Sequence, residues 1–426
     1  MRGGSTIESV GAREVLDSRG NPTVEAEVVT SRSVGRASVP SGASKGRLEA
    51  LELRDGDERR FHGKGVRKAV ANVEKVIGPR IKGLDASDLR RVDERMIRLD
   101  GTPNKSKIGA NAILAVSMAT VRAAAIANST SLFSQLRRRL SYTLPVPMMN
   151  VINGGEHAGN DLAMQEFLIE PVGARSCSEA IRMGSEVYQS LKEVLSSKYG
   201  RGAINVGDEG GFAPPLGITR DALQSIREAV AKSGYGEADV RLGIDAASST
   251  FYDAKTKKYV VDNETMDEGE LEDFYTALRD EFALLTIEDP FREDDFDSFA
   301  SITKRLGAKT KIIGDDIYVT NVERMKMGIK AKATNAVLIK LNQIGSVSET
   351  VDAIELARKA DWSVIVSHRS GETEDPFIAH LATAYGSDFI KTGAPARGER
   401  VAKYNELLRI EEELKSKARY AGRQFG

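Results

Sequence analysis

Seven short apolar segments of the sequence each end on a polar or charged residue. In chain order these residues are Glu209, Asp245, Glu288, Asp315, Lys340, His368 and Lys391. One charged residue after a strand usually marks only the point where the strand reaches water. The last four intervals are 23 to 28 residues long, which is typical of one strand, one helix and two loops. The seven side chains are therefore predicted to share one edge of a sheet.

Three of the seven residues, Asp245, Glu288 and Asp315, are carboxylates on successive predicted strands. Close together they would repel one another without a cation, and oxygen ligands suit Mg²⁺. The sequence has one cysteine and no HExxH segment, so zinc is the weaker interpretation. A Mg²⁺ site is predicted at this edge.

Lys340 and Glu209 are candidates for proton transfer. Burial and a neighbouring Mg²⁺ would both lower the pKa of Lys340 toward the range of a base, although a salt bridge to Asp315 explains this lysine equally well. Glu209 lies in GDEGG, and Glu166 is a second carboxyl expected at the same edge. Two close carboxyls raise the pKa of one of them, which could keep a proton available for acid catalysis.

The segment HRSG at 368–371 offers the guanidinium of Arg369 and the hydroxyl of Ser370 ahead of a helix expected to begin near Thr373. With Lys391 on the next strand, these groups predict a site for a phosphate or carboxylate. A base, an acid, a divalent cation and an anion site together indicate proton abstraction next to a carboxylate. The metal would stabilise the resulting ene-diolate.

The elements that position these residues are read from the apolar pattern. Helical stripes such as Leu223, Ile226 and Val230 separate the apolar segments. Segments with both faces apolar indicate a parallel sheet covered by helices, and their number over about 270 residues predicts an α/β protein with a closed (β/α)8 TIM-type barrel. An open doubly wound sheet is the alternative, but no Gly-rich dinucleotide-binding segment follows any of these strands.

The N-terminal third has a different pattern. Residues 24–28 alternate between apolar residues and glutamate, which predicts a half-buried strand, and a second strand is expected at 35–39. The stretch 108–127 is rich in alanine and carries the polar side chains of Asn111 and Arg122, so a buried helix is expected rather than a membrane span. We expect an N-terminal α+β capping domain over 1–140 and a barrel domain that carries the catalytic site over 141–426.

The overall composition is that of a globular protein without a dominant charge. The chain has 61 Lys plus Arg and 62 Asp plus Glu, a net charge of -1, so no global field favours nucleic acid or an anionic membrane as a partner. The single cysteine, Cys177, excludes an internal disulfide and suits a reducing compartment. The N-terminus lacks the apolar segment of a secretory signal, and a cytoplasmic location is expected.

Ten short motifs along the chain resemble the enolase family in order and spacing. They are DSRGNPT (17–23), VPSGAS (39–44), NVINGGEHAGN (150–160), MQEF (164–167), GDEGG (207–211), IEDPF (287–291), GDD (314–316), KLNQIG (340–345), SHRSGETED (367–375) and KTGAP (391–395). The resemblance implies Mg²⁺-dependent, reversible dehydration of 2-phosphoglycerate to phosphoenolpyruvate, in glycolysis and gluconeogenesis.

The resemblance also implies a role for each matching residue. Lys340 would remove the C2 proton, and Glu209, supported by Glu166, would protonate the departing C3 hydroxyl; the catalytic set further includes His157 and His368. Asp245, Glu288 and Asp315 would hold one Mg²⁺, and Ser44 would join a second, substrate-dependent Mg²⁺. The substrate contacts implied are Gln165, His157, Glu166, Glu288, Asp315, Lys340, Arg369, Ser370 and Lys391.

Further features follow from the resemblance. The barrel would begin irregularly, as ββαα(βα)6, and the loops around 41–44 and His157 would be mobile lids. Lys45 stands where the family pattern SGAST has threonine, so lid closure or affinity for the second metal could differ. The resemblance implies a homodimer or octamer, and allows presence at the cell surface without a signal peptide. Two alternatives stay open: a related barrel enzyme that acts on another small carboxylate anion, and a non-catalytic binding protein that keeps the fold.

Overall fold

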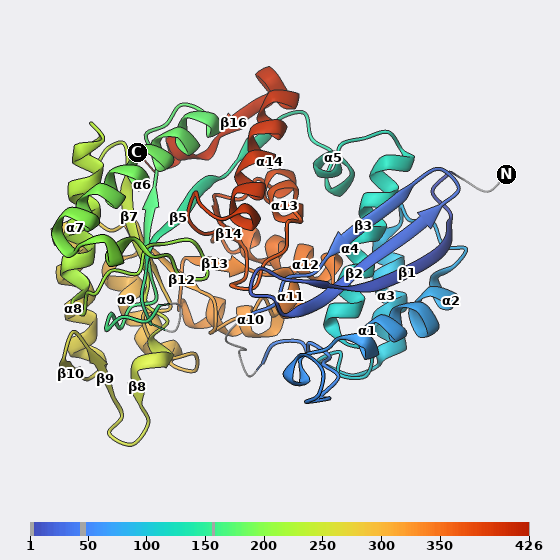
Figure 1. The fold of residues 1–426 in the computed structure, drawn as a ribbon, viewed down its shortest axis with the longest axis horizontal. Helices are drawn as coiled ribbons and strands as arrows, with labels where there is room; N and C mark the ends of the chain where they lie inside the picture. The colour runs from blue at the N-terminus through green and yellow to red at the C-terminus, as the bar shows by residue number, and fades with distance from the viewer. Residues whose placement is uncertain (1–3, 43–47, 156–157, 426) are drawn as a thin grey trace.

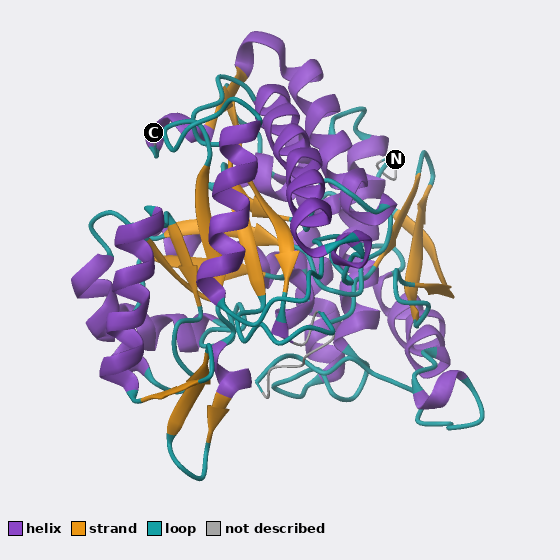
Figure 2. Ribbon diagram, turned by 60° about the vertical axis from the view of Figure 1, so that its left-hand side comes forward, coloured by secondary structure: helices purple, strands orange, loops and turns teal. Residues whose placement is uncertain are grey.

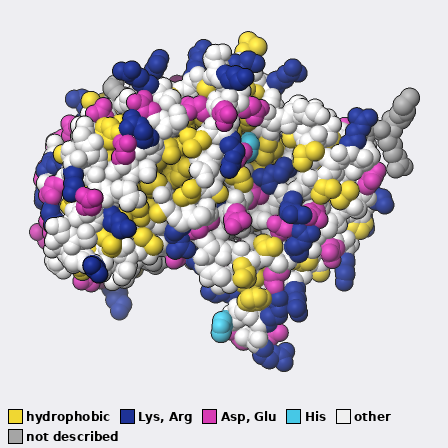
Figure 3. All heavy atoms as spheres, turned by 45° about the horizontal axis from the view of Figure 1, so that its top comes forward, with side chains coloured by type: hydrophobic (Ala, Val, Ile, Leu, Met, Phe, Trp, Pro, Cys, Tyr) yellow, Lys and Arg dark blue, Asp and Glu magenta, His cyan; other side chains and the backbone are white. Residues whose placement is uncertain are grey.

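The computed structural model describes residues 4–42, 48–155 and 158–425. Figure 1 shows a small N-terminal sheet at one end of the molecule and a closed barrel surrounded by helices at the other. The charged side chains on the face drawn in Figure 3 are of both signs and interspersed, in keeping with the net charge of -1.

The N-terminal sheet is antiparallel and consists of β1 (Ile7–Leu16), β2 (Pro22–Thr30) and β3 (Val34–Ser38). Along β2 the apolar residues at 24, 26 and 28 are fully buried, whereas the intervening glutamates are partly exposed. This alternation is the signal read from the sequence, and both predicted strands are confirmed.

Helix α4 (Ala110–Ala127) covers the buried face of this sheet. A Cβ atom at Gly35 would lie 2.2 Å from the carbonyl oxygen of Ala119 and 2.3 Å from the nitrogen of Ala123, so only glycine permits this close approach. The helix is long and apolar enough to cross a membrane, but 83% of it is buried inside the protein. The prediction of a buried helix is confirmed.

The remaining regular elements of the N-terminal part are helical. They are η1 (Phe61–Gly63), α1 (Arg67–Asn72), the π-helical turn η2 (Val73–Ile77), α2 (Gly78–Ile81), α3 (Leu89–Asp100) and α5 (Leu132–Leu136).

Eight strands close the barrel. They are β5 (Val146–Asn153), β6 (Glu166–Glu170), β7 (Arg241–Asp245), β11 (Thr286–Glu288), β12 (Lys311–Gly314), β13 (Ala336–Ile339), β14 (Ser363–Ser367) and β15 (Phe389–Lys391). Six neighbouring pairs are parallel, but β6 runs antiparallel to both β5 and β7. A fully parallel barrel was therefore the wrong expectation at this point. The chain passes from β5 to β6 without a crossover helix, and a strand that returns this way must run in the opposite direction.

Helices wrap the barrel, as Figure 2 shows. They are α6 (Cys177–Tyr199), α7 (Thr219–Lys232), α8 (Glu268–Phe282), α9 (Phe296–Leu306), α10 (Val322–Ala331), α11 (Leu341–Ile344), α12 (Val347–Lys359), α13 (Phe377–Tyr385) and α14 (Gly398–Leu414). With the two-helix step after β6, the order ββαα(βα)6 implied by the family resemblance is confirmed.

Smaller elements complete the fold. They are β4 (Tyr142–Leu144), η4 (Arg201–Ile204), η5 (Ser248–Phe251), β8 (Tyr252–Asp253), β9 (Lys258–Val261), β10 (Glu264–Met266), η6 (Lys415–Lys417), β16 (Ala418–Tyr420) and η7 (Ala421–Gln424). The small sheet β8–β10 is inserted between β7 and α8, which makes that strand–helix unit longer than the others.

Two local predictions were wrong. No strand ends at Glu209: residues 207–210 form a turn closed by a hydrogen bond from the amide of Gly210 to the carbonyl of Gly207, and Gly210 has a φ of +85°. The helix expected near Thr373 begins instead at Phe377. Pro376 disfavours helical backbone at the residue before it, and a carboxylate oxygen of Asp375 accepts the amide of Phe377 at 2.9 Å.

Candidate active site

The polar residues that follow the barrel strands lie at one mouth of the barrel. Asp245, Glu288 and Lys391 are the last residues of β7, β11 and β15, while Asp315 and Lys340 directly follow β12 and β13. Because β6 runs in reverse, its first residue, Glu166, lies at the same edge and pairs with Asp245. The predicted convergence is confirmed, and it includes the one carboxyl that stands at the start of a strand.

Lys391 joins three of the carboxylates. Its Nζ atom lies 2.7 Å from Asp245 Oδ2, 2.8 Å from Glu288 Oε2 and 3.0 Å from Glu166 Oε2. Burial disfavours the ammonium form, but the three negative charges outweigh burial and raise the pKa of Lys391 well above its usual value. Burial and the Asp245 charge likewise raise the pKa of Glu288 well above its usual value.

Lys340 forms an ion pair with Asp315 Oδ2, and Gln343 Nε2 donates to Asp315 Oδ1 at 3.0 Å. Burial alone would lower the pKa of Lys340, but the Asp315 carboxylate outweighs it and raises that pKa. The salt-bridge interpretation of Lys340 is therefore confirmed for this arrangement, whereas the lowered pKa was expected for a site that holds Mg²⁺ and stays a prediction. For Asp315, burial opposes ionisation, but the Lys340 ammonium holds the pKa of that carboxyl below its usual value.

Glu166 and Glu209 form a pair of neighbouring carboxyls joined by a side-chain hydrogen bond. Burial, and then the neighbouring Glu209 charge, raise the pKa of Glu166 well above its usual value, and a hydrogen bond between the two side chains adds to the shift. Glu209 Oε2 also accepts Asn150 Nδ2 at 3.1 Å and lies 3.3 Å from His368 Nε2. The expected carboxyl with a raised pKa is confirmed at Glu166.

Arg369 is positioned from the N-terminal part of the chain. Its two Nη atoms bind the Glu49 carboxylate at 3.0 and 3.1 Å, in a bidentate ion pair. Two backbone hydrogen bonds, of 2.7 and 2.8 Å, join Ser41 to Gly371 in the same loop. The N-terminal part therefore contributes directly to the barrel mouth, and the guanidinium predicted to bind an anion is here paired with a carboxylate of the chain itself.

Most of the predicted site residues line one cavity. Its walls comprise Gln165, Glu166, Glu209, Asp245, Ala247, Thr250, Asp289, Asp315, Asp316, Lys340, Ser367, His368, Arg369, Ser370 and Lys391. A much larger cavity of about 820 Å³ lies between the N-terminal sheet and the loops around α13 and α14, and it contains none of the site residues predicted from the sequence. Chemistry rather than volume singles out the barrel mouth as the site.

Comparison with known proteins agrees with this geometry. Residues 141–426 match the family model described as "Enolase, C-terminal TIM barrel domain", and residues 7–136 match "Enolase, N-terminal domain". A curated enolase of Methanocaldococcus jannaschii is 59% identical over 420 residues, which cover 98% of each chain. Enolases of Thermococcus gammatolerans and Pyrococcus furiosus are 55% and 54% identical over 420 residues, which cover 98% of this chain and 97% of each relative.

The chain belongs to the enolase family. Of the residues that the enolase resemblance singled out, those in the described ranges lie at the barrel mouth. Gln165 precedes β6, and its backbone N–H donates to the backbone carbonyl of Asp245 at 3.0 Å. Ser370 lies in the loop after β14. Ser44, Lys45 and His157 lie outside the described residues.

The donor set at the mouth of this enolase-family barrel suits a hard divalent cation. Asp245, Glu288 and Asp315 offer only carboxylate oxygens, and Glu288 Oε1 is buried with no hydrogen-bond partner among the described residues. The carboxylates here outnumber the two lysines, so a bound cation would relieve their repulsion. Metal dependence fits the residues present.

Asp289 and Asp316 also belong to the acidic cluster, and the sequence analysis missed them. The ligand oxygens of Asp289, Asp315 and Asp316 lie within 4.8 Å of one another. Both oxygens of Asp289, however, accept backbone amides, from Asp315 at 3.0 Å and Asp316 at 2.8 Å. Asp289 therefore holds the turn that presents Asp315. Its position directly after Glu288 in IEDPF was the available signal.

Proposed function

We propose that the protein catalyses the reversible, Mg²⁺-dependent dehydration of 2-phospho-D-glycerate to phosphoenolpyruvate, as a hydro-lyase of glycolysis and gluconeogenesis. The observation that carries the proposal is the meeting of Lys340, the carboxyl pair of Glu166 and Glu209, and the carboxylates of Asp245 and Asp315 around one cavity, in a chain 59% identical to an enolase.

Lys340 is the proposed base for the C2 proton. In the structure its amine is held protonated by Asp315, so Lys340 acts as a base only after that ion pair opens. Asp315 would then be available, with Asp245 and Glu288, to hold the metal. Bound Mg²⁺ would supply positive charge to the substrate carboxylate as negative charge builds up there.

The carboxyl pair is the proposed acid. Glu209, with Glu166 beside it, would deliver a proton to the departing C3 hydroxyl, and the raised pKa of Glu166 supports a proton shared by this pair. His368 contacts Glu209 and is assigned to the same machinery.

The anion site is assigned to Gln165, Arg369, Ser370 and Lys391, with His157 as a further substrate contact. A substrate phosphate would replace the Glu49 carboxylate on Arg369, because a guanidinium binds either group through the same pair of donors. Ser44 is the proposed ligand of a second Mg²⁺, which would bind with substrate.

The wider assignments rest on the family. We propose an N-terminal capping domain over 1–140 and a catalytic barrel domain over 141–426, a division that the two matched family models support. The proposal is completed by a homodimer or octamer, by a cytoplasmic location with display at the cell surface without a signal peptide, and by the absence of nucleic-acid or membrane partners.

The deciding experiment is to incubate the purified protein with 2-phosphoglycerate and Mg²⁺ and to follow phosphoenolpyruvate by its absorbance. Product that forms only with Mg²⁺ is expected. Absence of product would favour a non-catalytic protein, and turnover only of another carboxylate anion would favour a related barrel enzyme.

The roles of base and acid separate in isotope exchange. The Lys340→Ala variant should lose exchange of the substrate C2 proton with solvent, because its base is gone. The Glu209→Gln variant should keep exchange but lose dehydration. Exchange that persists in the lysine variant would assign the base to another residue.

A further inference from the structure

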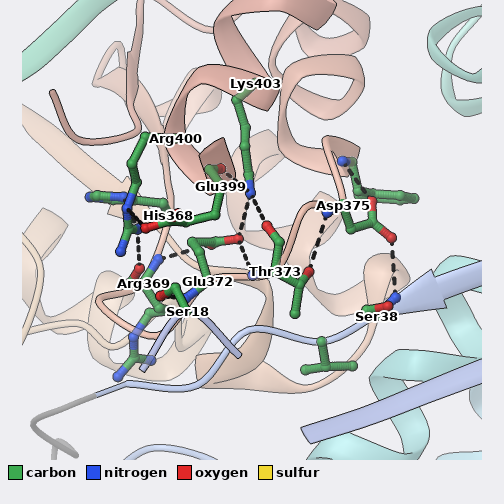
Figure 4. Close-up of polar contacts among 12 residues, drawn as sticks. Ser18, Ser38, His368, Arg369, Glu372, Thr373, Asp375, Glu399, Arg400 and Lys403 are labelled. Atoms are coloured by element: carbon green, nitrogen blue, oxygen red, sulfur yellow. Dashed lines mark hydrogen bonds and ion pairs between the residues drawn. The ribbon is translucent and has the colours of Figure 1, made fainter. Parts of the chain in front are cut away.

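Two buried basic side chains of helix α14 donate hydrogen bonds to the loop that follows β14. Arg400 and Lys403 are one helical turn apart and have no exposed surface. Figure 4 shows Arg400 reaching His368 and Lys403 reaching Glu372 and Thr373. Burying two charges is costly unless each is fully engaged, and the proposed reaction uses neither of them.

Arg400 connects two loops of the active site. Its Nη1 atom donates to the carbonyl of Arg369 at 2.6 Å, and its Nη2 atom donates to the carbonyls of Ser370 at 2.6 Å and Asp208 at 3.0 Å. Asp208 directly precedes Glu209 in the other loop. The same guanidinium therefore holds the loop of the proposed acid against the loop of the anion site.

Arg400 Nη1 also lies 2.7 Å from Nδ1 of His368. An arginine guanidinium can only donate hydrogen bonds and does not lose its proton in proteins, so Nδ1 of His368 must be the acceptor. The ring proton is then on Nε2, which faces Glu209 Oε2 at 3.3 Å. We propose that Arg400 is a positioning residue that fixes His368 as the neutral, Nε2-protonated tautomer and so makes it a hydrogen-bond donor to Glu209.

The other charges that face His368 agree with a neutral ring. Burial, together with the Arg400 charge, outweighs the carboxylates of Glu209 and Glu372 and lowers the pKa of His368 to about 4. The Glu372 carboxylate is itself paired with Lys403 Nζ at 2.8 Å. Lys403 thus engages the remaining carboxylate near the ring without contacting His368.

This part of the inference rests on the proposed function: the tautomer decides which oxygen of Glu209 handles the proton. Glu209 Oε2 accepts N–H groups from Asn150 and His368, so a proton carried by Glu209 sits on Oε1. The opposite tautomer would present a lone pair to Glu209 and could take the proton meant for the substrate.

Nitrogen-15 NMR of the histidine rings tests the tautomer without any substrate. The sequence has only four histidines, and the spectrum of a His368→Gln variant identifies the signals of His368. The spectra are recorded in the solid state at neutral pH, because slow tumbling of a large oligomer does not broaden solid-state signals. One protonated and one unprotonated nitrogen are expected, with the proton on Nε2. A proton on Nδ1, or on both nitrogens, would overturn the proposal.

Variants of the two cations separate positioning from stability. Arg400→Met should give a mixture of His368 tautomers, whereas Arg400→Lys keeps a donor and should retain the Nε2-protonated form. Lys403→Met is the matched control, because it removes the neighbouring buried cation and should leave the tautomer unchanged. If Lys403→Met changes the populations of the His368 tautomers as much as Arg400→Met does, the change reflects a general disturbance of the loop. That result would refute the positioning role of Arg400.

Kinetics then test the consequence for catalysis. In folded Arg400→Met, kcat should fall roughly 10-fold to 100-fold, with a smaller change in KM, as is usual when the partner that orients a site residue is lost. An unchanged kcat would refute the catalytic consequence. If Arg400→Met does not fold, the wild-type spectrum still decides the tautomer. An expected spectrum from a protein that forms no phosphoenolpyruvate would refute only the proposed reaction.

Discussion

Replacing Glu170 with glutamine should make the stability of the protein less sensitive to a rise in pH. Glu170, the last residue of β6, is fully buried, and its Oε1 accepts Thr286 Oγ1 at 2.6 Å. Gly243 leaves the space for this contact, since a Cβ there would lie 2.1 Å from Thr286 Oγ1. Oε2 of Glu170 has no hydrogen-bond partner among the described residues. Burial therefore dominates and raises the pKa of Glu170 from 4.5 to about 7.

The direction of the pH effect follows from this shift. A carboxyl with a higher pKa in the folded than in the unfolded protein binds more protons when folded, so stability falls as pH rises from about 4.5 through about 7. At ~1.4 kcal/mol per pKa unit, the loss is about 1 kcal/mol at pH 5 and about 3 kcal/mol at pH 8.5. Glutamine has no charge to bury, so Glu170→Gln should avoid this loss.

Urea denaturation of Glu170→Gln and wild type at both pH values measures the effect. The difference between the two proteins in free energy of unfolding should change by roughly 2 kcal/mol in favour of the variant between pH 5 and pH 8.5. Effects of the amide that do not depend on pH cancel in this comparison. Glu237→Gln, at an exposed position, is the control and should show no such change. A difference equal at both pH values would refute the reasoning.

Three further predictions concern other parts of the molecule. Arg122 of α4 forms a bidentate ion pair with Asp375 in the loop after β14, and the Asp375 side chain is only 6% exposed. Arg122→Leu should therefore lower the free energy of unfolding by roughly 3–5 kcal/mol in denaturant titrations, because it leaves the Asp375 carboxylate without its partner. Adding Asp375→Leu should restore part of this loss; no recovery would contradict the explanation by an unpaired carboxylate. Under the proposed function Mg²⁺ binds the carboxylate set of the folded protein and not the unfolded chain, so adding Mg²⁺ should raise the melting temperature, and Asp245→Asn should remove most of that rise; an equal rise in both proteins would place the ion elsewhere. Cys177 is fully buried, and burial raises the pKa of its thiol, so a thiol reagent should react with it only after denaturation; rapid reaction of the native protein would contradict this placement.

Much of the barrel and its mouth was predictable because the signals are local. A strand buried on both faces is a short apolar run, and its last residue points to the mouth whatever the rest of the chain does. Asp245, Glu288 and Lys391 were found in this way. The signal failed at Glu209, because a run of small apolar residues followed by glycines resembles a strand end but folds as a turn.

The pairings among the site residues were not predictable in this way. Lys391 and Asp245 are separated by 146 positions, and Arg369 and Glu49 by 320. No local sequence pattern predicts which basic side chain forms an ion pair with which carboxylate. The pKa of Lys340 shows the consequence: burial and an adjacent anion act in opposite directions, and only the position of Asp315 decides the sign.

The sequence by itself determined the fold class, the family and the residue types gathered at the barrel mouth, because apolar periodicity and short motifs are properties of neighbouring residues. Only the tertiary structure decided the ion-pair partner, the charge and the tautomer of each side chain at the site. It paired Lys340 with Asp315, put Glu49 on Arg369, and brought Arg400 from α14 against His368. Charge and tautomer depend on distance and burial, which exist only once segments far apart in the chain have packed together.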